Sequence, residues 1–186
     1  MTGPAWDAGS ELTPSRTVVL ALGSNLGDRL ANLQRGLDAV CGDGLRCRAV
    51  SAVFETTPVG GPAQDDFLNA VLLADSSLPA EVVLHRCQRA EAASGRVRTV
   101  RWGPRTLDVD VIACGSEVRA DPELILPHPR AHERAFVLAP WLDVAPAACL
   151  PGYGPVAALL SAVGAGGVRR VPELALALPG EARPCR

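Results

Sequence analysis

Short apolar runs alternate with two longer amphipathic segments between residues 17 and 114, and this order leaves few folds open to the chain. The first run, T-V-V-L-A-L over 17–22, is rich in β-branched residues and stops at Gly23, which predicts a buried strand. Runs of similar character predict three further strands, at 46–54, 67–74 and 107–114.

Two segments with helical spacing lie between these runs. In the first, Asp28 is a capping residue before apolar residues spaced three and four apart up to Cys41, and Gly42 stops the helix. In the second, Pro79 opens a helix that has Glu81 in its first turn and continues to about Ser94. The order strand–helix–strand–strand–helix–strand predicts an α+β fold with a ferredoxin-like split-βαβ core. Its helices are expected to pack on an antiparallel or mixed sheet as an α/β sandwich.

The chain divides into one domain and two tails. Residues 1–16 are rich in Gly, Pro, Ser and Thr without a period, which predicts a flexible N-terminal tail, and the Pro-rich residues 172–186 predict a loose C-terminal tail. Residues 17–171 are expected to form a single domain. Within it, residues 55–66 predict a loop, and residues 119–165 predict short helices and turns.

All 18 basic residues are Arg, and the chain has no Lys. This excludes a phosphate-binding P-loop, the protein-kinase site and Schiff-base chemistry, because each of these needs a lysine amine. A GC-rich genome would also explain the bias. Whatever its cause, any phosphate bound here must be met by arginine, whose planar guanidinium contacts phosphate oxygens bidentately.

The charge pattern, the lack of targeting signals and the cysteine content indicate which partners and which location to expect for the protein. The net charge is −2 with both signs scattered along the chain, so we expect neither a nucleic-acid partner nor a membrane surface partner. We find no signal-peptide pattern and no apolar run long enough for a membrane span, which predicts a cytoplasmic protein. None of the six cysteines has C-x-x-C spacing, so buried free thiols are expected rather than a disulfide framework.

Two carboxylates stand two residues apart on the predicted strand at 107–114. Side chains alternate along a strand, so Asp108 and Asp110 project from one face, about 7 Å apart. Aligned carboxylates suit Mg²⁺, and two such ions can hold a phosphoryl group during its transfer. A solvated strand face is the alternative explanation of an isolated D-x-D pair.

A cluster of four arginines precedes that pair, and the helix before it carries two polar residues. The cluster comprises Arg96, Arg98, Arg101 and Arg105. Their guanidinium groups repel one another unless an anion binds between them or the loop is well solvated. Cations facing a metal site are what phosphoryl transfer requires. On the helix, Gln88 and Glu91 are three apart and share a face, which fits either a common ligand or ordinary surface polarity.

These motifs together resemble the signature of the 6-hydroxymethyl-7,8-dihydropterin pyrophosphokinases. The central string is R-W-G-P-R-T-L-D-V-D at 101–110, preceded by Q-R-A-E at 88–91 and G-R-V-R at 95–98. Further matches are L-A-L-G-S-N-L-G-D at 20–28, T-T-P-V-G at 56–60, F-L-N-A at 67–70, L-P-H-P-R at 126–130 and R-A-F at 134–136. They follow the family's order from about residue 17 to about residue 150.

The resemblance implies transfer of the terminal two phosphates of ATP to the hydroxymethyl group of a dihydropterin, with release of AMP, in tetrahydrofolate biosynthesis. It implies that Asp108 and Asp110 hold two Mg²⁺ ions and that Arg96 and Arg105 act on the phosphates. It further implies residues that contact or cover ATP: Gln88, Glu91, Arg98, Trp102, Arg105, His128 and Arg134. A monomer with only these small-molecule substrates as partners is expected.

For the pterin, the resemblance implies that Asn69 reads the hydrogen-bonding edge of the ring. Thr56, Pro58 and Val59 help through backbone groups, and Phe67 and Phe136 stack on the two ring faces. Two core phenylalanines are the alternative.

The sequence departs from the family in the loop after 95–98, where Thr99 and Val100 stand where some members have a Lys, and at Thr57, where many have Pro. An RNA-binding sheet is disfavoured because the chain lacks both a basic surface and the expected aromatic pair. A nucleotide hydrolase would need a general base beside the aspartates, and we find no candidate.

Overall fold

The computed structural model describes residues 15–58, 62–95 and 103–181 of the 186-residue chain. Its centre is a six-stranded sheet in which β10, β3, β4, β1 and β5 follow one another and β2 also pairs with β4; every pairing is antiparallel. The strands are β1 (Arg16–Ser24), β2 (Leu45–Val50), β3 (Phe54–Thr56), β4 (Phe67–Ser76), β5 (Asp108–Cys114) and β10 (Val168–Arg170).

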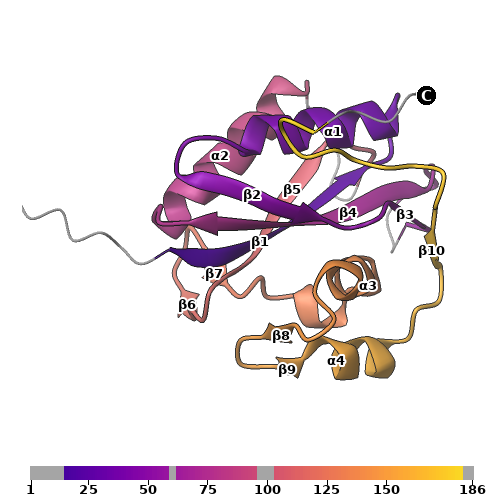
Figure 1. Ribbon diagram of the computed structural model, residues 1–186. Coiled ribbons are helices and arrows are strands. Elements are labelled where there is room, and N and C mark those ends of the chain that lie inside the picture. The colour runs from indigo at the N-terminus through magenta and orange to yellow at the C-terminus, as the bar shows by residue number, and fades with distance from the viewer. Residues whose placement is uncertain (1–14, 59–61, 96–102, 182–186) are drawn as a thin grey trace, which may run out of the picture.

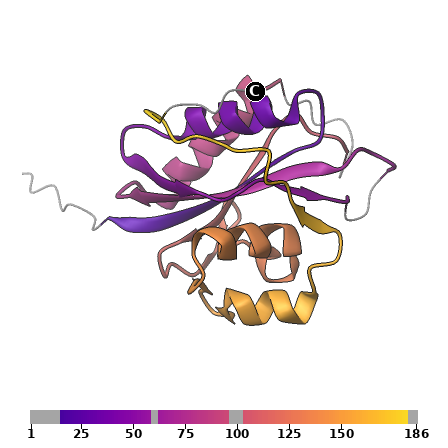
Figure 2. The ribbon, with the colours of Figure 1, turned by 45° about the vertical axis from the view of Figure 1, so that its right-hand side comes forward.

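Helices cover both faces of this sheet (Figures 1 and 2). On one side lie α1 (Arg29–Val40) and α2 (Ala80–Ala93), and on the other lie α3 (Ala135–Val144) and α4 (Val156–Val163). Smaller elements connect them: the pairs β6 (Arg119–Ala120) with β7 (Ile125–Leu126) and β8 (Cys149–Leu150) with β9 (Gly154–Pro155), and the 3-10 helix η1 (Ala131–Glu133). The α+β sandwich expected from the order of the segments is confirmed.

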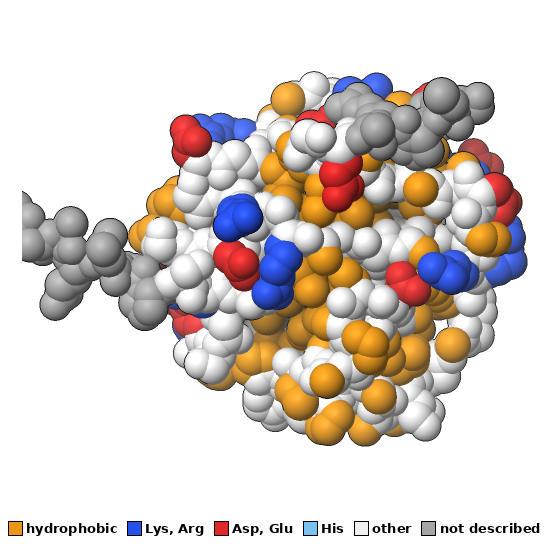
Figure 3. Space-filling view, viewed as in Figure 1, with side chains coloured by type: hydrophobic (Ala, Val, Ile, Leu, Met, Phe, Trp, Pro, Cys, Tyr) orange, Lys and Arg blue, Asp and Glu red, His pale blue; other side chains and the backbone are white. Residues whose placement is uncertain are grey.

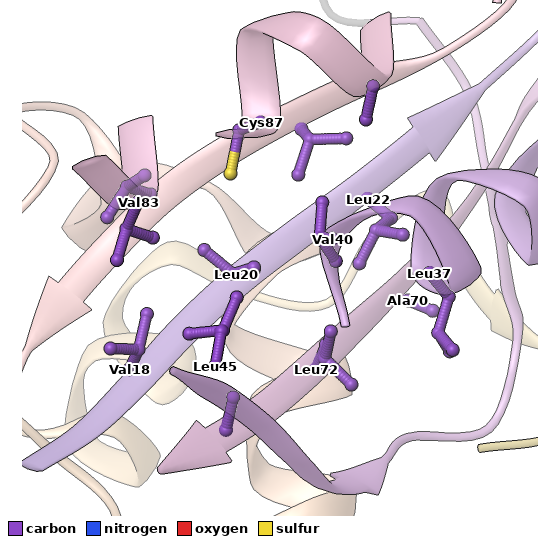
Figure 4. Packing of buried hydrophobic residues seen from close by; sticks show 14 of the residues in the cluster. Val18, Leu20, Leu22, Leu37, Val40, Leu45, Ala70, Leu72, Val83 and Cys87 are labelled. Atoms are coloured by element: carbon purple, nitrogen blue, oxygen red, sulfur yellow. The ribbon is translucent and has the colours of Figure 1, made fainter. Parts of the chain in front are cut away.

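A separate hydrophobic cluster fills each side of the sheet. Leu20, Leu22 and Leu72 face α1 and α2, where Leu37 and Val40 pack onto them (Figure 4). The residues between them in sequence point the other way, because side chains alternate across a strand. A second cluster on that side joins strand residues to α3; it includes Val71, Ile112, Val137, Leu138 and Trp141. Since both faces are filled, polar side chains gather at the strand ends.

The run expected as one strand over 46–54 is two strands, β2 and β3. Both pair with β4, β2 along its second half and β3 along its first. Ser51 lies between β2 and β3 and bonds to β4 in place of a regular strand residue. Its amide donates to the carbonyl of Val71 at 2.9 Å, and its hydroxyl accepts from the amide of Val71 at 2.9 Å. Glu55 and Thr56, expected in a loop, are therefore strand residues.

The described part of the C-terminal segment, 172–181, packs on the domain instead of lying loose. Leu176 and Ala177 are buried. The Gln34 side chain on α1 holds Ala177 from both sides: Nε2 donates to its carbonyl at 2.9 Å and Oε1 accepts from its amide at 3.0 Å. Figures 1 and 2 show this yellow segment crossing α1.

Cys41 and Cys47 form a disulfide, with their Cα atoms 5.6 Å apart. The expectation of free thiols is wrong for this pair, because the turn after α1 brings the C-cap residue Cys41 beside β2. It holds for Cys87 and Cys114, which are free and buried, and burial raises the pKa of the Cys87 thiol to about 12. Among the helices of the described ranges, none has the length and apolarity that a membrane crossing requires.

Candidate active site

Three neighbouring strands place Asn69, Gly23 and Asp108 in one row. In the antiparallel register, Gly23 of β1 lies opposite Asn69 of β4 on one side and opposite Asp108 of β5 on the other. Residues directly opposite one another share a face. That face is the α3 side, since Val71, two residues after Asn69, packs in the α3 cluster.

Gly23 leaves open space in the middle of this row. A Cβ atom at this position would lie 3.0 Å from Oδ1 of Asn69, 3.9 Å from Cδ1 of Phe67 and 4.0 Å from Cβ of Asp108. The predicted pterin residues and the predicted metal residue therefore converge on one backbone position.

Asp110 follows Asp108 on the same face, and two arginines and a histidine lie beside the pair. Arg105 forms an ion pair with Asp108. Nη1 of Arg134 lies 3.3 Å from Oδ2 of Asp110, and Nε2 of His128 lies 3.8 Å from the same oxygen. His128 is held beside β5 because its amide donates to the carbonyl of Ile112 at 2.9 Å. The structure thus brings Arg105, His128 and Arg134 together at the aspartates.

The aspartate pair carries unfavourable negative charge. Burial raises the pKa of the Asp110 carboxyl, and the neighbouring Asp108 raises it further, although His128 and Arg134 act in the opposite direction. Burial lowers the pKa of His128, against the effect of Asp110. A site of this kind favours an added cation.

The residues at this position fit Mg²⁺. Both carboxylates are partly exposed, at 19% for Asp108 and 34% for Asp110, so an ion can reach them. Within the described ranges, no three acidic, histidine or cysteine side chains gather as a complete protein cage. Mg²⁺ needs no such cage, since one or two carboxylates with water and substrate phosphates are its usual ligands.

Glu91 and Gln88 do not share an environment, although they lie three apart on α2. Gln88 is exposed, whereas Glu91 is 6% exposed and points at β5. Oε1 of Glu91 accepts a 2.9 Å hydrogen bond from the amide of Val109. Glu91 therefore acts on the strand between the two aspartates, a contact that helical spacing alone did not predict.

On the pterin side, the Asn69 amide is oriented by Thr56. Nδ2 of Asn69 donates to Oγ1 of Thr56 at 2.7 Å, and both residues are buried. Phe67 and Phe136 are each partly exposed, and the guanidinium of Arg134 lies 5.5 Å from the centre of the Phe136 ring. The exposed parts of these rings are available to a planar ligand.

Some predicted residues lie outside the described ranges: Val59, Arg96, Arg98 and Trp102. Pro58 is the last described residue before 59–61.

Two residues of the site were not singled out from the sequence, Gly23 and Asn25. Both lie in the G-S-N stretch at the end of β1, and only strand register reveals the contacts of Gly23. Asn25 borders a cavity of about 490 Å³ that residues 64–66 also line and that does not include Asp108 or Asp110.

Comparison with known proteins gives consistent matches. Residues 19–146 match the family model described as 7,8-dihydro-6-hydroxymethylpterin-pyrophosphokinase (HPPK). The chain is 51% identical over 158 residues to the 2-amino-4-hydroxy-6-hydroxymethyldihydropteridine pyrophosphokinase of Mycobacterium bovis, covering 77% of this chain and 82% of that protein. It is 39% identical over 158 residues to the protein of that name from Pseudomonas aeruginosa, covering 83% and 96%.

Solved structures share the fold at low sequence identity. Plasmodium falciparum HPPK-DHPS, wild type with STZ-DHP, superposes with a TM-score of 0.64 at 13% identity over 82% of this chain. The wild type with SDX-DHP gives 0.64 at 12% over 87%. The chain spans less than half of those two chains, 44% and 48%.

Proposed function

The chain belongs to the 7,8-dihydro-6-hydroxymethylpterin-pyrophosphokinase family, and from that membership we propose how its own residues carry out the reaction. The reaction transfers pyrophosphate from the co-substrate ATP to a hydroxymethyldihydropterin, in folate biosynthesis. The observation that carries the proposal is the row of Asn69, Gly23 and Asp108 on adjacent strands. It supports a pterin held by Asn69 with its hydroxymethyl group directed along the row toward Asp108.

At the phosphate end, we propose that Asp108 and Asp110 hold two Mg²⁺ ions. Bound there, the ions would neutralise charge on the ATP phosphates. The unfavourable charge of the aspartate pair supports this assignment. Arg105 and Arg134, which form ion pairs with the aspartates in the structure, would turn to phosphate oxygens when ATP binds beside them.

The remaining nucleotide roles rest on the sequence motifs. Arg96 is proposed to face the transferred group, and Arg98 and Trp102 to cover the bound substrates and exclude water. His128 lies beside Asp110 and so is suited to the phosphate chain. Gln88 is exposed on α2, where it remains available to the nucleotide.

At the pterin end, we propose that Asn69 reads the ring edge, with Thr56 fixing the amide in one orientation. Phe67 and Phe136 would stack on the two faces of the ring, in line with their partial exposure. Backbone groups of 56–59 would complete the contacts. The hydroxymethyl oxygen of the substrate is then the nucleophile, and the site holds it toward the phosphates while keeping water away.

We propose no partner beyond the two small-molecule substrates. On the face shown in Figure 3, basic and acidic side chains lie close to one another. The expectation of no nucleic-acid partner stays a prediction from the charge of the sequence. A monomeric state and a cytoplasmic location stay predictions from the sequence.

The two-ion assignment is tested by the dependence of the rate on free Mg²⁺ at fixed total ATP. Two ions predict that the rate continues to rise after ATP is saturated with one Mg²⁺, and that Asp108→Asn and Asp110→Asn each shift this second phase to higher Mg²⁺. Asp121→Asn is the matched control, because Asp121 lies in a separate ion-pair cluster with Arg119. A rate that saturates with the first ion, unshifted in both variants, contradicts the assignment.

A further inference from the structure

Asn25, the residue after β1, is bonded to two loops that enter different parts of the site. The side-chain oxygen Oδ1 of Asn25 accepts a 2.7 Å hydrogen bond from the backbone amide of Arg105. The backbone amide of Asn25 donates to the carbonyl of Arg105 at 3.0 Å. Nδ2 donates to Oε1 of Gln64 at 3.0 Å and to the carbonyl of Asp65 at 3.1 Å. The residue is only 2% exposed. One buried side chain therefore joins residues 64–65 to residue 105.

Each of these loops leads directly into one half of the site. Residues 64–65 precede β4, which begins at Phe67 and carries Asn69 on the pterin side. Arg105 precedes β5, which begins at Asp108 on the phosphate side. The pair of bonds between Asn25 and Arg105 runs in both directions, so it fixes the orientation of that loop as well as its distance. The strand β1 separates the two halves, and the two loops meet beyond its end.

We propose that Asn25 is a positioning residue that sets the alignment of the dihydropterin relative to the ATP phosphates, by holding the loop before β4 and the loop before β5 at a fixed separation. The inference rests on the proposed function. Each polar group of the side chain is engaged by the protein, so Asn25 acts through the two loops and not by touching a substrate. Transfer rates depend steeply on such alignment, and a displacement of about 1 Å can cost on the order of a hundredfold.

A purely structural role for a buried amide in this turn is the competing explanation, and the chain provides a matched control for it. Asn32, on α1, is 4% exposed. Its Nδ2 donates to Oγ of Ser24 at 3.2 Å and to the carbonyl of Leu26 at 2.8 Å. Asn32 thus supports the same turn as Asn25, but its side-chain bonds within the described ranges go to Ser24, Leu26 and Arg35 and not to residues 64–65 or residue 105.

The experiment compares Asn25→Ala and Asn32→Ala with the wild type in melting temperature, steady-state kinetics and binding. Binding is measured separately for the dihydropterin alone and for a non-hydrolysable ATP analogue with Mg²⁺. The proposal predicts similar losses of melting temperature in the two variants. It predicts that kcat falls about 10- to 100-fold in Asn25→Ala and less than about threefold in Asn32→Ala. Each ligand alone should bind Asn25→Ala within about threefold of its wild-type affinity, because each half of the site stays intact.

A conservative variant covers the case in which Asn25→Ala does not fold. Asn25→Asp keeps the acceptor for the Arg105 amide and loses both donors to residues 64–65, so kcat should still fall with ligand binding retained. A normal kcat in Asn25→Asp overturns the proposal. Equal kcat losses in Asn25→Ala and Asn32→Ala also overturn it, as does a loss of affinity for one ligand that accounts for the whole effect.

The failure of this inference is distinguishable from failure of the proposed function. A wild-type protein that forms no AMP from ATP and the dihydropterin refutes the function, and the inference falls with it. An active wild type with an equally active Asn25→Ala refutes the inference alone.

Discussion

Oε1 of Glu91 on α2 accepts a 2.9 Å hydrogen bond from the backbone amide of Val109, the residue between Asp108 and Asp110. The bond crosses from the helix layer to the start of β5 and is buried. It fixes the backbone from which both carboxylates project. A residue that sequence motifs associate with the nucleotide therefore also supports the two aspartates from the opposite side of the sheet.

Two substitutions of Glu91 distinguish the effect of its hydrogen-bond acceptor from the effect of its negative charge. Glu91→Ala leaves the Val109 amide without its acceptor, so we expect a loss of about 1–3 kcal/mol in the free energy of unfolding. We also expect that the rate needs a higher Mg²⁺ concentration to saturate. Glu91→Gln keeps an acceptor oxygen and should retain most of the stability. Urea unfolding and Mg²⁺ titrations of both variants measure this. If Glu91→Gln is as unstable as Glu91→Ala, the hydrogen bond is not what matters.

Gly23→Ala should impair turnover with little loss of stability. The new methyl group would press on Oδ1 of Asn69 at 3.0 Å and would lie next to Asp108, so it would enter the space that we propose separates the pterin from the phosphates. We expect kcat/KM to fall by about 10²-fold, as for other small displacements of reacting groups. Gly166→Ala is the control, because no atom lies within 4 Å of its added Cβ. Equal activity in the two variants would contradict the proposed junction.

Asp110→Asn should lower the rate and raise the stability of the metal-free protein. Removing one charge-stabilising group from a site of this type costs about 10²- to 10³-fold in kcat. The folded-state pKa of Asp110 is raised above its ordinary value of 3.8, so ionisation of Asp110 costs folding stability as pH rises through the folded-state pKa. The variant avoids that cost. Its advantage in metal-free unfolding experiments should be present at neutral pH and vanish below the ordinary value.

The opposite result is informative as well. If metal-free Asp110→Asn is less stable than the wild type at neutral pH, the ion pair with Arg134 outweighs burial and the repulsion from Asp108. The charge argument for a cation at this position would then fail.

Asn69→Ala should weaken dihydropterin binding and spare ATP binding. Thr56→Val is the companion variant, because it removes only the hydroxyl that orients the Asn69 amide at 2.7 Å. We expect the same selectivity with a smaller effect, about tenfold or less, since a net hydrogen bond contributes about 0.5–1.5 kcal/mol. Separate binding titrations for each ligand provide the measurement. Equal losses for both ligands would count against a pterin subsite at Asn69.

Features that depend on neighbouring residues could be predicted from the sequence. The cap Asp28 of α1 accepts from the amide of Ala31 at 3.1 Å, and the second helix begins after Pro79 as expected. Alternation along a strand was enough to place Asp108 and Asp110 on one face. The element order was enough to predict a sheet with α1 and α2 packed on it, whereas the cover of its other face comes from α3 and α4, which follow that order in the chain.

Features that depend on register and tertiary contact could not be predicted. The row through Gly23 exists because β1 pairs with β4 and β5 in a particular register, which no local pattern specifies. Spacing left open whether Gln88 and Glu91 share a ligand or are ordinary surface residues, but the position of α2 over β5 buries only Glu91. The Cys41–Cys47 disulfide likewise depends on how β2 returns beside the end of α1.

In the proposed reaction, the site transfers two phosphates as one unit to a pterin hydroxymethyl group. The most direct measurement is to incubate the protein with ATP, Mg²⁺ and 6-hydroxymethyl-7,8-dihydropterin and to identify the products by ³¹P NMR and chromatography. We expect AMP and the dihydropterin diphosphate in equal amounts from the wild type, and almost no product from Asp110→Asn. Formation of ADP with a pterin monophosphate, or of phosphate released to water, would contradict it.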